Sequence, residues 1–276
     1  MYPAIFTRTY PITNTAQVLS TVALDGYAGV QFNLLSAGLV SLPDILPEGL
    51  AEEVGEYARL NGLVIAALSG TYNMAHPDPA VRIASRVGFA NVVEAAHRMG
   101  APVVTLCTGS RDPSNMWKSH PGNTTAAAWQ DLLTELDYAL EVADQTGVKL
   151  AVEPEPANVI RDAASARRLL DEVASPHLGI VLDAANLLSP ESLPHQGAVI
   201  SHAVELLGDS ILLAHAKDIN ASGQVVAAGD GAVDLAAFIA ALRSAGYGGA
   251  LIGHGFSVEK TRQVVKVLAR LAGTTS

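Results

Sequence analysis

The chain has 276 residues, of which 49% are hydrophobic and 16% charged, and its formal net charge is −10. This composition allows a large buried core and excludes a disordered chain, which would contain fewer apolar residues. The acidic balance, with no basic cluster larger than the pair Arg167 and Arg168, also argues against nucleic acid as a partner, because affinity for phosphate backbones comes from clustered cations.

Short apolar runs alternate with longer amphipathic stretches along the whole chain. Each short run predicts a buried strand, and each stretch with apolar residues three or four positions apart predicts a helix. In chain order the predicted strand and helix of each pair are 4–7 and 14–23, 29–33 and 48–60, 63–68 and 79–99, 102–106 and a helix starting at 124 or 125, 148–153 and 162–173, 178–182 and 197–207, 211–214 and 234–245, and 250–253 and 258–271.

Eight strand–helix pairs in strict alternation indicate parallel strands joined by helical crossovers. In a chain of this length, eight pairs predict a closed (β/α)8 TIM barrel that forms a single domain over residues 1–276. A doubly wound sheet is the alternative fold. It would need a glycine-rich phosphate turn after the first strand, and residues 8–13 contain no glycine.

The cell compartment is predicted from cysteine use and from hydropathy. Cys107 is the only cysteine, so a disulfide within the chain is excluded and a reducing compartment is favoured. The first ten residues show no positively charged leader before an apolar run, and no apolar stretch reaches the ~18 residues of a spanning helix. We therefore predict a cytoplasmic protein with no membrane partner.

Four consecutive strands end on side chains that commonly bind metal ions. The fifth strand ends on Glu153, the sixth on Asp183, the seventh on His215 and the eighth on His254. All strands of a barrel of this type point their carboxyl ends at one face, where active sites lie. The pattern therefore predicts a metal site formed by these four residues, although each alone could be an ordinary capping or loop residue.

Several motifs resemble one family of barrels. Glu153-Pro154-Glu155, Asp183 and the run from His215 to Asp218 look like the sugar phosphate isomerase/epimerase group, as do residues 229–234 and 246–249. This group belongs to the xylose isomerase-like barrels, which include ketose 3-epimerases and apurinic DNA-repair endonucleases. The resemblance implies a (β/α)8 barrel in which Glu153, Asp183 and His215 bind a divalent metal ion.

The chain departs from the pattern of this group at two positions. The fourth metal ligand is normally a glutamate at the tip of the eighth strand, where this chain has His254. A substrate-binding histidine often follows the aspartate by three residues, where this chain has Asn186. The first departure puts the usual epimerisation by two glutamates in doubt.

The donor set also predicts which ions and which catalytic groups to expect. Two carboxylates and two imidazoles suit manganese or zinc best, with iron, cobalt and magnesium as alternatives. A ligating neutral imidazole cannot act as a base, so His254 is either the fourth ligand, which we favour, or a free acid or base. We expect Glu153 to be the catalytic base, with Glu155 as its partner and Lys217 stabilising negative charge.

Loop residues supply the remaining candidates for substrate binding. The long loops after the third and fourth strands are of the kind that often carries function. These loops contain four candidates, of which Arg111 is the one expected to contact an anionic group of the substrate. A fifth candidate, Asn186, follows the sixth strand. The candidates are Asn73, His76, Arg111, His120 and Asn186.

Four functions remain open from the sequence. The leading hypothesis is a metal-dependent isomerase or epimerase of a sugar, sugar phosphate or sugar acid, which acts through an enediolate. A lyase or dehydratase would need the same intermediate. A phosphodiesterase would need more histidines at the strand ends and a basic surface, neither of which is apparent. A barrel that only binds a partner would not need residues of the metal-binding type, so their presence speaks against it. The expected partner is a small carbohydrate, and a homo-oligomer remains open.

Overall fold

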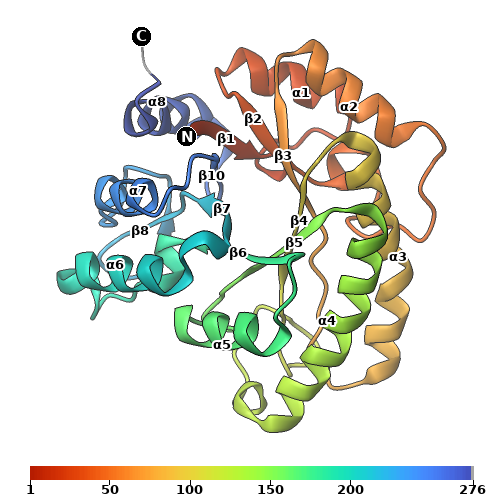
Figure 1. Cartoon of the computed structure of the whole chain (residues 1–276). Helices are drawn as coiled ribbons and strands as arrows, with labels where there is room; N and C mark the ends of the chain where they lie inside the picture. The colour runs from red at the N-terminus through yellow and green to blue at the C-terminus, as the bar shows by residue number, and fades with distance from the viewer. Residues whose placement is uncertain (275–276) are drawn as a thin grey trace.

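Eight parallel strands form a closed barrel at the centre of the molecule (Figure 1). The computed structural model describes residues 1–274. Around the barrel the strand order is β1-β10-β7-β6-β5-β4-β3-β2, and every neighbouring pair is parallel. The strands are β1 (Tyr2–Phe6), β2 (Gly29–Phe32), β3 (Val64–Ser69), β4 (Val103–Cys107), β5 (Lys149–Glu153), β6 (Leu178–Asp183), β7 (Ile211–His215) and β10 (Ala250–Gly253). The predicted fold is therefore confirmed.

Eight long helices surround the barrel (Figure 1). They are α1 (Thr15–Leu24), α2 (Leu50–Leu60), α3 (Pro79–Met99), α4 (Ala126–Thr146), α5 (Ala163–Val173), α6 (Gln196–Leu207), α7 (Leu235–Ser244) and α8 (Thr261–Ala272). Polar side chains cap the N-termini of several helices. The Asp78 carboxylate accepts a hydrogen bond from the backbone N–H of Ala80 at the start of α3, and Asp162 forms a capping box with Ser165 on α5. Within residues 1–274 no helix is both long and apolar enough to cross a lipid bilayer.

The loop after β7 contains a small hairpin that the sequence did not predict. Its strands are β8 (Asp218–Ile219) and β9 (Val225–Val226), and two-residue strands are too short to give a periodic signal. The buried Asp218 carboxylate shapes the rest of this loop, because it accepts hydrogen bonds from the backbone N–H groups of Gly229, Gly231 and Val233. The last helix also begins later than predicted, since residues 258–260 form a separate 3-10 turn.

Small apolar side chains fill the interior of the barrel. Ala151, Val181, Leu213 and Ile252 belong to a buried cluster contributed by the strands. Side chains two positions apart on a strand point to the same side. The residue two positions after each of these four is Glu153, Asp183, His215 or His254. The four polar side chains therefore point to the same side of their strands as these apolar residues and lie directly above the packed interior.

A buried ionic cluster between α3 and α4 holds two of the loops at the mouth of the barrel. Glu135 on α4 is 1% exposed and pairs with Arg82 and Arg86 on α3, at 3.4 and 3.0 Å. Its carboxylate also accepts a hydrogen bond from the Tyr72 hydroxyl, in the loop after β3. Arg82 reaches further, to Asp131 and to the backbone carbonyl of His76. The loop after β3 is thus tied to the helical layer.

Replacing Glu135 by Gln is expected to lower the free energy of unfolding by roughly 1–3 kcal/mol, because Arg86 would lose its carboxylate partner and Arg82 would keep only Asp131. The urea midpoint of the variant, read by circular dichroism, measures the loss. Glu56→Gln is the matched control, since Glu56 pairs with Arg59 on the exposed face of α2 and exposed ion pairs contribute little. Equal midpoints for the two variants would contradict the prediction.

Candidate metal centre

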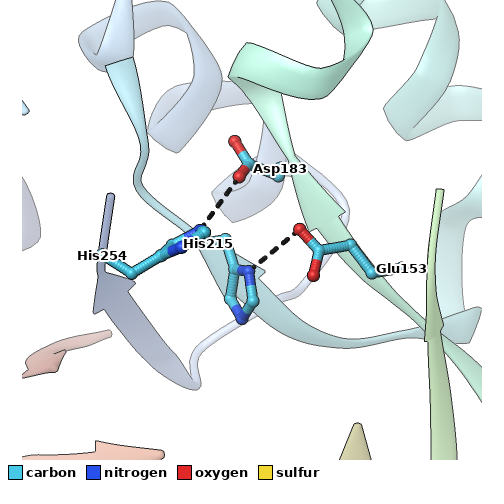
Figure 2. Close-up of side chains that lie close together, drawn as sticks. All are labelled: Glu153, Asp183, His215 and His254. Carbon is cyan, nitrogen blue, oxygen red and sulfur yellow. Dashed lines mark hydrogen bonds and ion pairs between the residues drawn. The ribbon is translucent and has the colours of Figure 1, made fainter. Parts of the chain in front are cut away.

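Two carboxylates and two imidazoles converge at the C-terminal end of the barrel (Figure 2). One donor atom from each of Glu153, Asp183, His215 and His254 lies within 4.8 Å of the donor atoms of the other three. Glu153, Asp183 and His215 are the last residues of β5, β6 and β7, and His254 follows β10 directly. The structure thus brings together the four strand-tip residues that the sequence singled out.

The four side chains form two contacting pairs (Figure 2). His215 Nδ1 lies 3.1 Å from Glu153 Oε1, and His254 Nε2 lies 3.2 Å from Asp183 Oδ2. The exposed fractions of Glu153, Asp183 and His215 are 6%, 1% and 3%. Three strand tips therefore hold charged or polar groups almost out of contact with water, at a cost that a bound cation would offset.

Burial and mutual charge shift the pKa values within the cluster. Burial alone would raise the pKa of Glu153, but the charges of His215 and Lys217 outweigh it and hold the pKa below its ordinary value. Burial opposes a charged His215, yet the Glu153 carboxylate raises its pKa. Burial and the neighbouring His215 lower the pKa of His254. Both carboxylates are therefore ionised at neutral pH, and His254 is the more easily neutral of the two imidazoles.

Gln31 on β2 fixes the orientation of the His215 ring. Its Oε1 lies 2.8 Å from His215 Nε2, and its Nε2 donates to Thr105 Oγ1 at 3.1 Å. Because the Gln31 amide already donates to Thr105, its oxygen is the atom that faces the imidazole and accepts the Nε2–H. Nδ1 is then the His215 nitrogen that faces Glu153 and the rest of the cluster, and it could bind a metal ion when it carries no proton. Neither Gln31 nor Thr105 could be connected with His215 from the sequence, since they lie far apart in the chain.

Lys217 and Asn186 link the carboxylates of Glu153, Glu155 and Asp183 through hydrogen bonds and ion pairs. The Lys217 ammonium lies 3.3 Å from Asp183 Oδ2 and 3.7 Å from Glu155 Oε1, and it donates to Asn186 Oδ1. Asn186 Nδ2 in turn donates to Glu153 Oε1 at 3.0 Å. Burial opposes the charge on Lys217, but Asp183, Glu153 and Glu155 together raise its pKa above the ordinary value. Lys217 is thus a cation at neutral pH, paired with Asp183 and Glu155 and hydrogen-bonded to Asn186.

From the sequence, Lys217 could either stabilise negative charge on a substrate or form a structural pair with Asp218 or Glu153. The side chains that it contacts are instead Asp183, Glu155 and Asn186. The Asp218 carboxylate is used instead by the backbone of residues 229–233. Neighbouring residues of an extended chain point in opposite directions, so Lys217 and Asp218 face different parts of the fold.

A cavity of about 400 Å³ opens above the cluster. Glu153, Glu155, His215 and His254 form its acidic and imidazole side. Burial and the nearby Glu153 charge raise the pKa of Glu155 to about 6. The other lining residues come mainly from β1 to β4 and the loops after them, and sequence reasoning had assigned none of them to the site: Phe6, Arg8, Gln31, Asn33, Ser41, Ser69, Thr71, Thr105, Cys107, Met116 and Trp117.

The four predicted substrate contacts in the loops after β3 and β4 do not line this cavity. Asn73 bonds the backbone N–H and carbonyl of Ser110, and His76 Nε2 lies 3.2 Å from the Pro113 carbonyl oxygen. Arg111 pairs with Asp131, and the His120 side chain accepts from the N–H of Gly122. Asn73 and His76 thus connect the two loops, Arg111 connects its loop to α4, and His120 bonds within its own loop.

The residues present fit a divalent cation. Two ionised carboxylates, one imidazole with a fixed tautomer and one that is readily neutral supply four donors of the types that zinc and manganese accept. The packed floor below and the cavity above leave one side for a further ligand. Magnesium fits less well, because it prefers a shell made only of oxygen.

A (β/α)8 barrel with a candidate metal centre at its strand tips is the class that the fold and the site define. The family described as the xylose isomerase-like TIM barrel matches residues 19–271, and the chain belongs to that family. The resemblance seen in the motifs around Glu153, Asp183 and His215 is thereby confirmed. No curated protein matches the chain in sequence.

Several solved structures share the fold. A D-tagatose 3-epimerase-like protein has a TM-score of 0.79 at 15% identity, over 99% of this chain and 97% of that one. The 3-keto-D-glucoside 4-epimerase of E. coli has a TM-score of 0.77 at 18% identity, over 99% of both chains. The IOLI protein, solved with a zinc atom, has a TM-score of 0.70 at 18% identity, over 99% of this chain and 95% of that one.

Proposed function

We propose that the protein is a metal-dependent isomerase or epimerase that moves a proton next to the carbonyl group of a sugar, sugar phosphate or sugar acid. The observation that carries the proposal is the convergence of Glu153, Asp183, His215 and His254 beneath one cavity. A bound divalent ion would polarise the carbonyl and hydroxyl oxygens of the substrate and stabilise an enediolate. Two structural neighbours, a D-tagatose 3-epimerase-like protein and a 3-keto-D-glucoside 4-epimerase, support the same class of substrate.

Glu153 is the residue placed to take the proton. Its Oε1 faces His215 and Asn186, whereas its Oε2 faces the Cys107 thiol, 3.8 Å away, on the side of the cavity. One oxygen can therefore hold the ion while the other accepts a proton from the substrate. Lys217 does not line the cavity, and its bonds to Asp183, Asn186 and Glu155 give it the role of holding these groups in place.

The position of the two carboxyl groups also supports a second candidate function. Glu153 and Glu155 belong to the same strand end and both line the cavity, while the imidazole of His254 lies at the tip of β10, three strands away around the barrel. Isomerisation between ketose and aldose, or elimination of water, needs proton transfer on one face of an enediolate. Epimerisation by two carboxyl groups needs both faces. A metal-dependent dehydratase therefore stands beside the isomerase as an alternative.

A deuterium-exchange experiment tests the proposal. The protein is stripped with a chelator, reloaded with Mn²⁺ or Zn²⁺ and incubated in D₂O with D-fructose, D-tagatose and D-fructuronate, and products are followed by NMR. We expect deuterium beside the carbonyl carbon only in the metal-loaded protein, and the product shows whether isomerisation, epimerisation or loss of water follows. Absence of exchange with all three compounds and both ions would contradict the proposal.

A further inference from the structure

We propose that the substrate carries an anionic group, a carboxylate or a phosphate, which Arg8 binds at the mouth of the cavity. This inference rests on the proposed function and narrows its substrate class. Arg8 lies in the 3-10 turn η1 (Thr7–Thr9) directly after β1, and it lines the same cavity as Glu153 and His254. Nothing in the sequence distinguished Arg8 from the other arginines, because its neighbours in space come from the far end of the chain.

The guanidinium of Arg8 has no counter-charge among residues 1–274. Nine of the other eleven arginines pair with a carboxylate, and Arg243 bonds two backbone carbonyls of α8, which leaves Arg8 and the surface residue Arg270. The Arg8 side chain is exposed at the edge of the cavity, so its guanidinium is accessible to a ligand there. A guanidinium matches carboxylate and phosphate oxygens with two parallel N–H donors.

The backbone that carries Arg8 is held firmly. The buried Thr7 hydroxyl accepts from the backbone N–H of Asn33 at 3.1 Å and from the Ser36 hydroxyl at 2.9 Å. These bonds join the end of β1 to the turn after β2. The Arg8 side chain is thus presented from an anchored turn, which lowers the entropy lost when a ligand is bound.

The surroundings of Arg8 favour an anion. Beside the main cavity, a second hollow of about 460 Å³ runs between the ends of β1 and β10, and Arg8 and His254 line both. None of its lining residues is acidic, and Arg8 is accompanied by the hydroxyls of Thr9 and Ser257: the full set is Phe6, Arg8, Thr9, His254, Gly255, Phe256 and Ser257. A ligand that spans the two hollows meets carboxylates at one end and a cation with hydroxyl groups at the other.

The charge balance of the site points the same way. The three carboxylates of Glu153, Glu155 and Asp183 would be balanced by Lys217 together with one divalent ion. Arg8 then adds one further positive charge at the mouth of the cavity. A neutral ketose would leave this charge unmatched, whereas a substrate with one anionic group would neutralise it. Attraction at short range would also offset the repulsion of an anion by a chain with a net charge of −10.

Binding of three related probes tests the inference, with the affinities measured by calorimetry for metal-loaded and for chelator-treated protein. The probes are D-fructose, D-fructuronate and D-fructose 6-phosphate. We expect the wild type to prefer at least one anionic probe over D-fructose, and Arg8→Gln to reduce that preference roughly 10- to 100-fold, the size of one lost charge-assisted pair. Arg8→Lys should recover part of it, and added salt should weaken it.

Arg270→Gln is the matched control, because it removes the other unpaired guanidinium from the surface of α8 and should leave the preference unchanged. If Arg8→Gln weakens binding of D-fructuronate alone, the anionic group that Arg8 binds is a carboxylate. If it weakens binding of D-fructose 6-phosphate alone, the group is a phosphate. An unchanged preference for both anions in Arg8→Gln overturns the inference, even if exchange in D₂O establishes the proposed function. Binding of an anion that depends on Arg8, with no exchange under any condition, would leave this inference standing and reject the proposed reaction.

Discussion

Glu153→Gln is expected to lower kcat at least ~100-fold, because the substitution removes both a proposed metal ligand and the proposed base, and general base catalysis alone contributes ~10²–10⁴-fold. The variant should keep its fold. Glutamine preserves the shape of the side chain and an oxygen that can accept the hydrogen bond from Asn186. Activity is measured by proton exchange beside the carbonyl of whichever probe the wild type converts, and urea unfolding checks the fold.

Glu155→Gln separates the two roles of the carboxyl groups. Glu155 lines the cavity without belonging to the metal cluster, so this variant should bind the ion as the wild type does. Glu153→Gln should bind it more weakly. If Glu153→Gln retains more than about a tenth of kcat, a loss below ~1.4 kcal/mol of barrier, Glu153 is not the base and Glu155 becomes the leading candidate.

The strand ends could be predicted because local patterns decide them. Each apolar run that stops on a polar residue marks where a buried strand meets water, and parallel strands bring all such ends to one face. Glu153, Asp183 and His215 were therefore predictable although they lie far apart in the sequence. The eight helices were predictable for a similar reason, since their caps, such as Asp78 before Pro79, are short-range signals.

The walls of the cavity could not be predicted in this way. Gln31 contacts His215 only because closure of the barrel brings β2 within reach of the far strands, and Arg8 lines the same cavity as His254 because β1 pairs with β10. The polar residues of the loops could not be assigned from the sequence either. Arg111 and His120 are residue types that often bind ligands, yet the Arg111 side chain pairs with Asp131 on α4 and the His120 side chain bonds within its own loop. Such roles depend on which groups remain unpaired after folding.

His254 is expected to be the fourth metal ligand. His254→Ala should therefore weaken metal binding by more than the ~10–100-fold that results from changing a residue beyond the ligands themselves. His254→Glu should keep the ion bound, because a carboxylate oxygen replaces the imidazole nitrogen at the same strand tip. The contact between His254 Nε2 and Asp183 Oδ2, at 3.2 Å, supports this role, since it places the imidazole nitrogen beside another donor of the cluster.

Titration of chelator-treated protein with Mn²⁺ and Zn²⁺ measures both substitutions, with His202→Ala as control because His202 is exposed on α6. The alternative role, a free acid or base, predicts that His254→Ala binds the ion with wild-type affinity and loses only activity. Wild-type affinity in the alanine variant would therefore refute ligation by His254. It would also reduce the centre to Glu153, Asp183 and His215 and assign the second proton transfer to the imidazole.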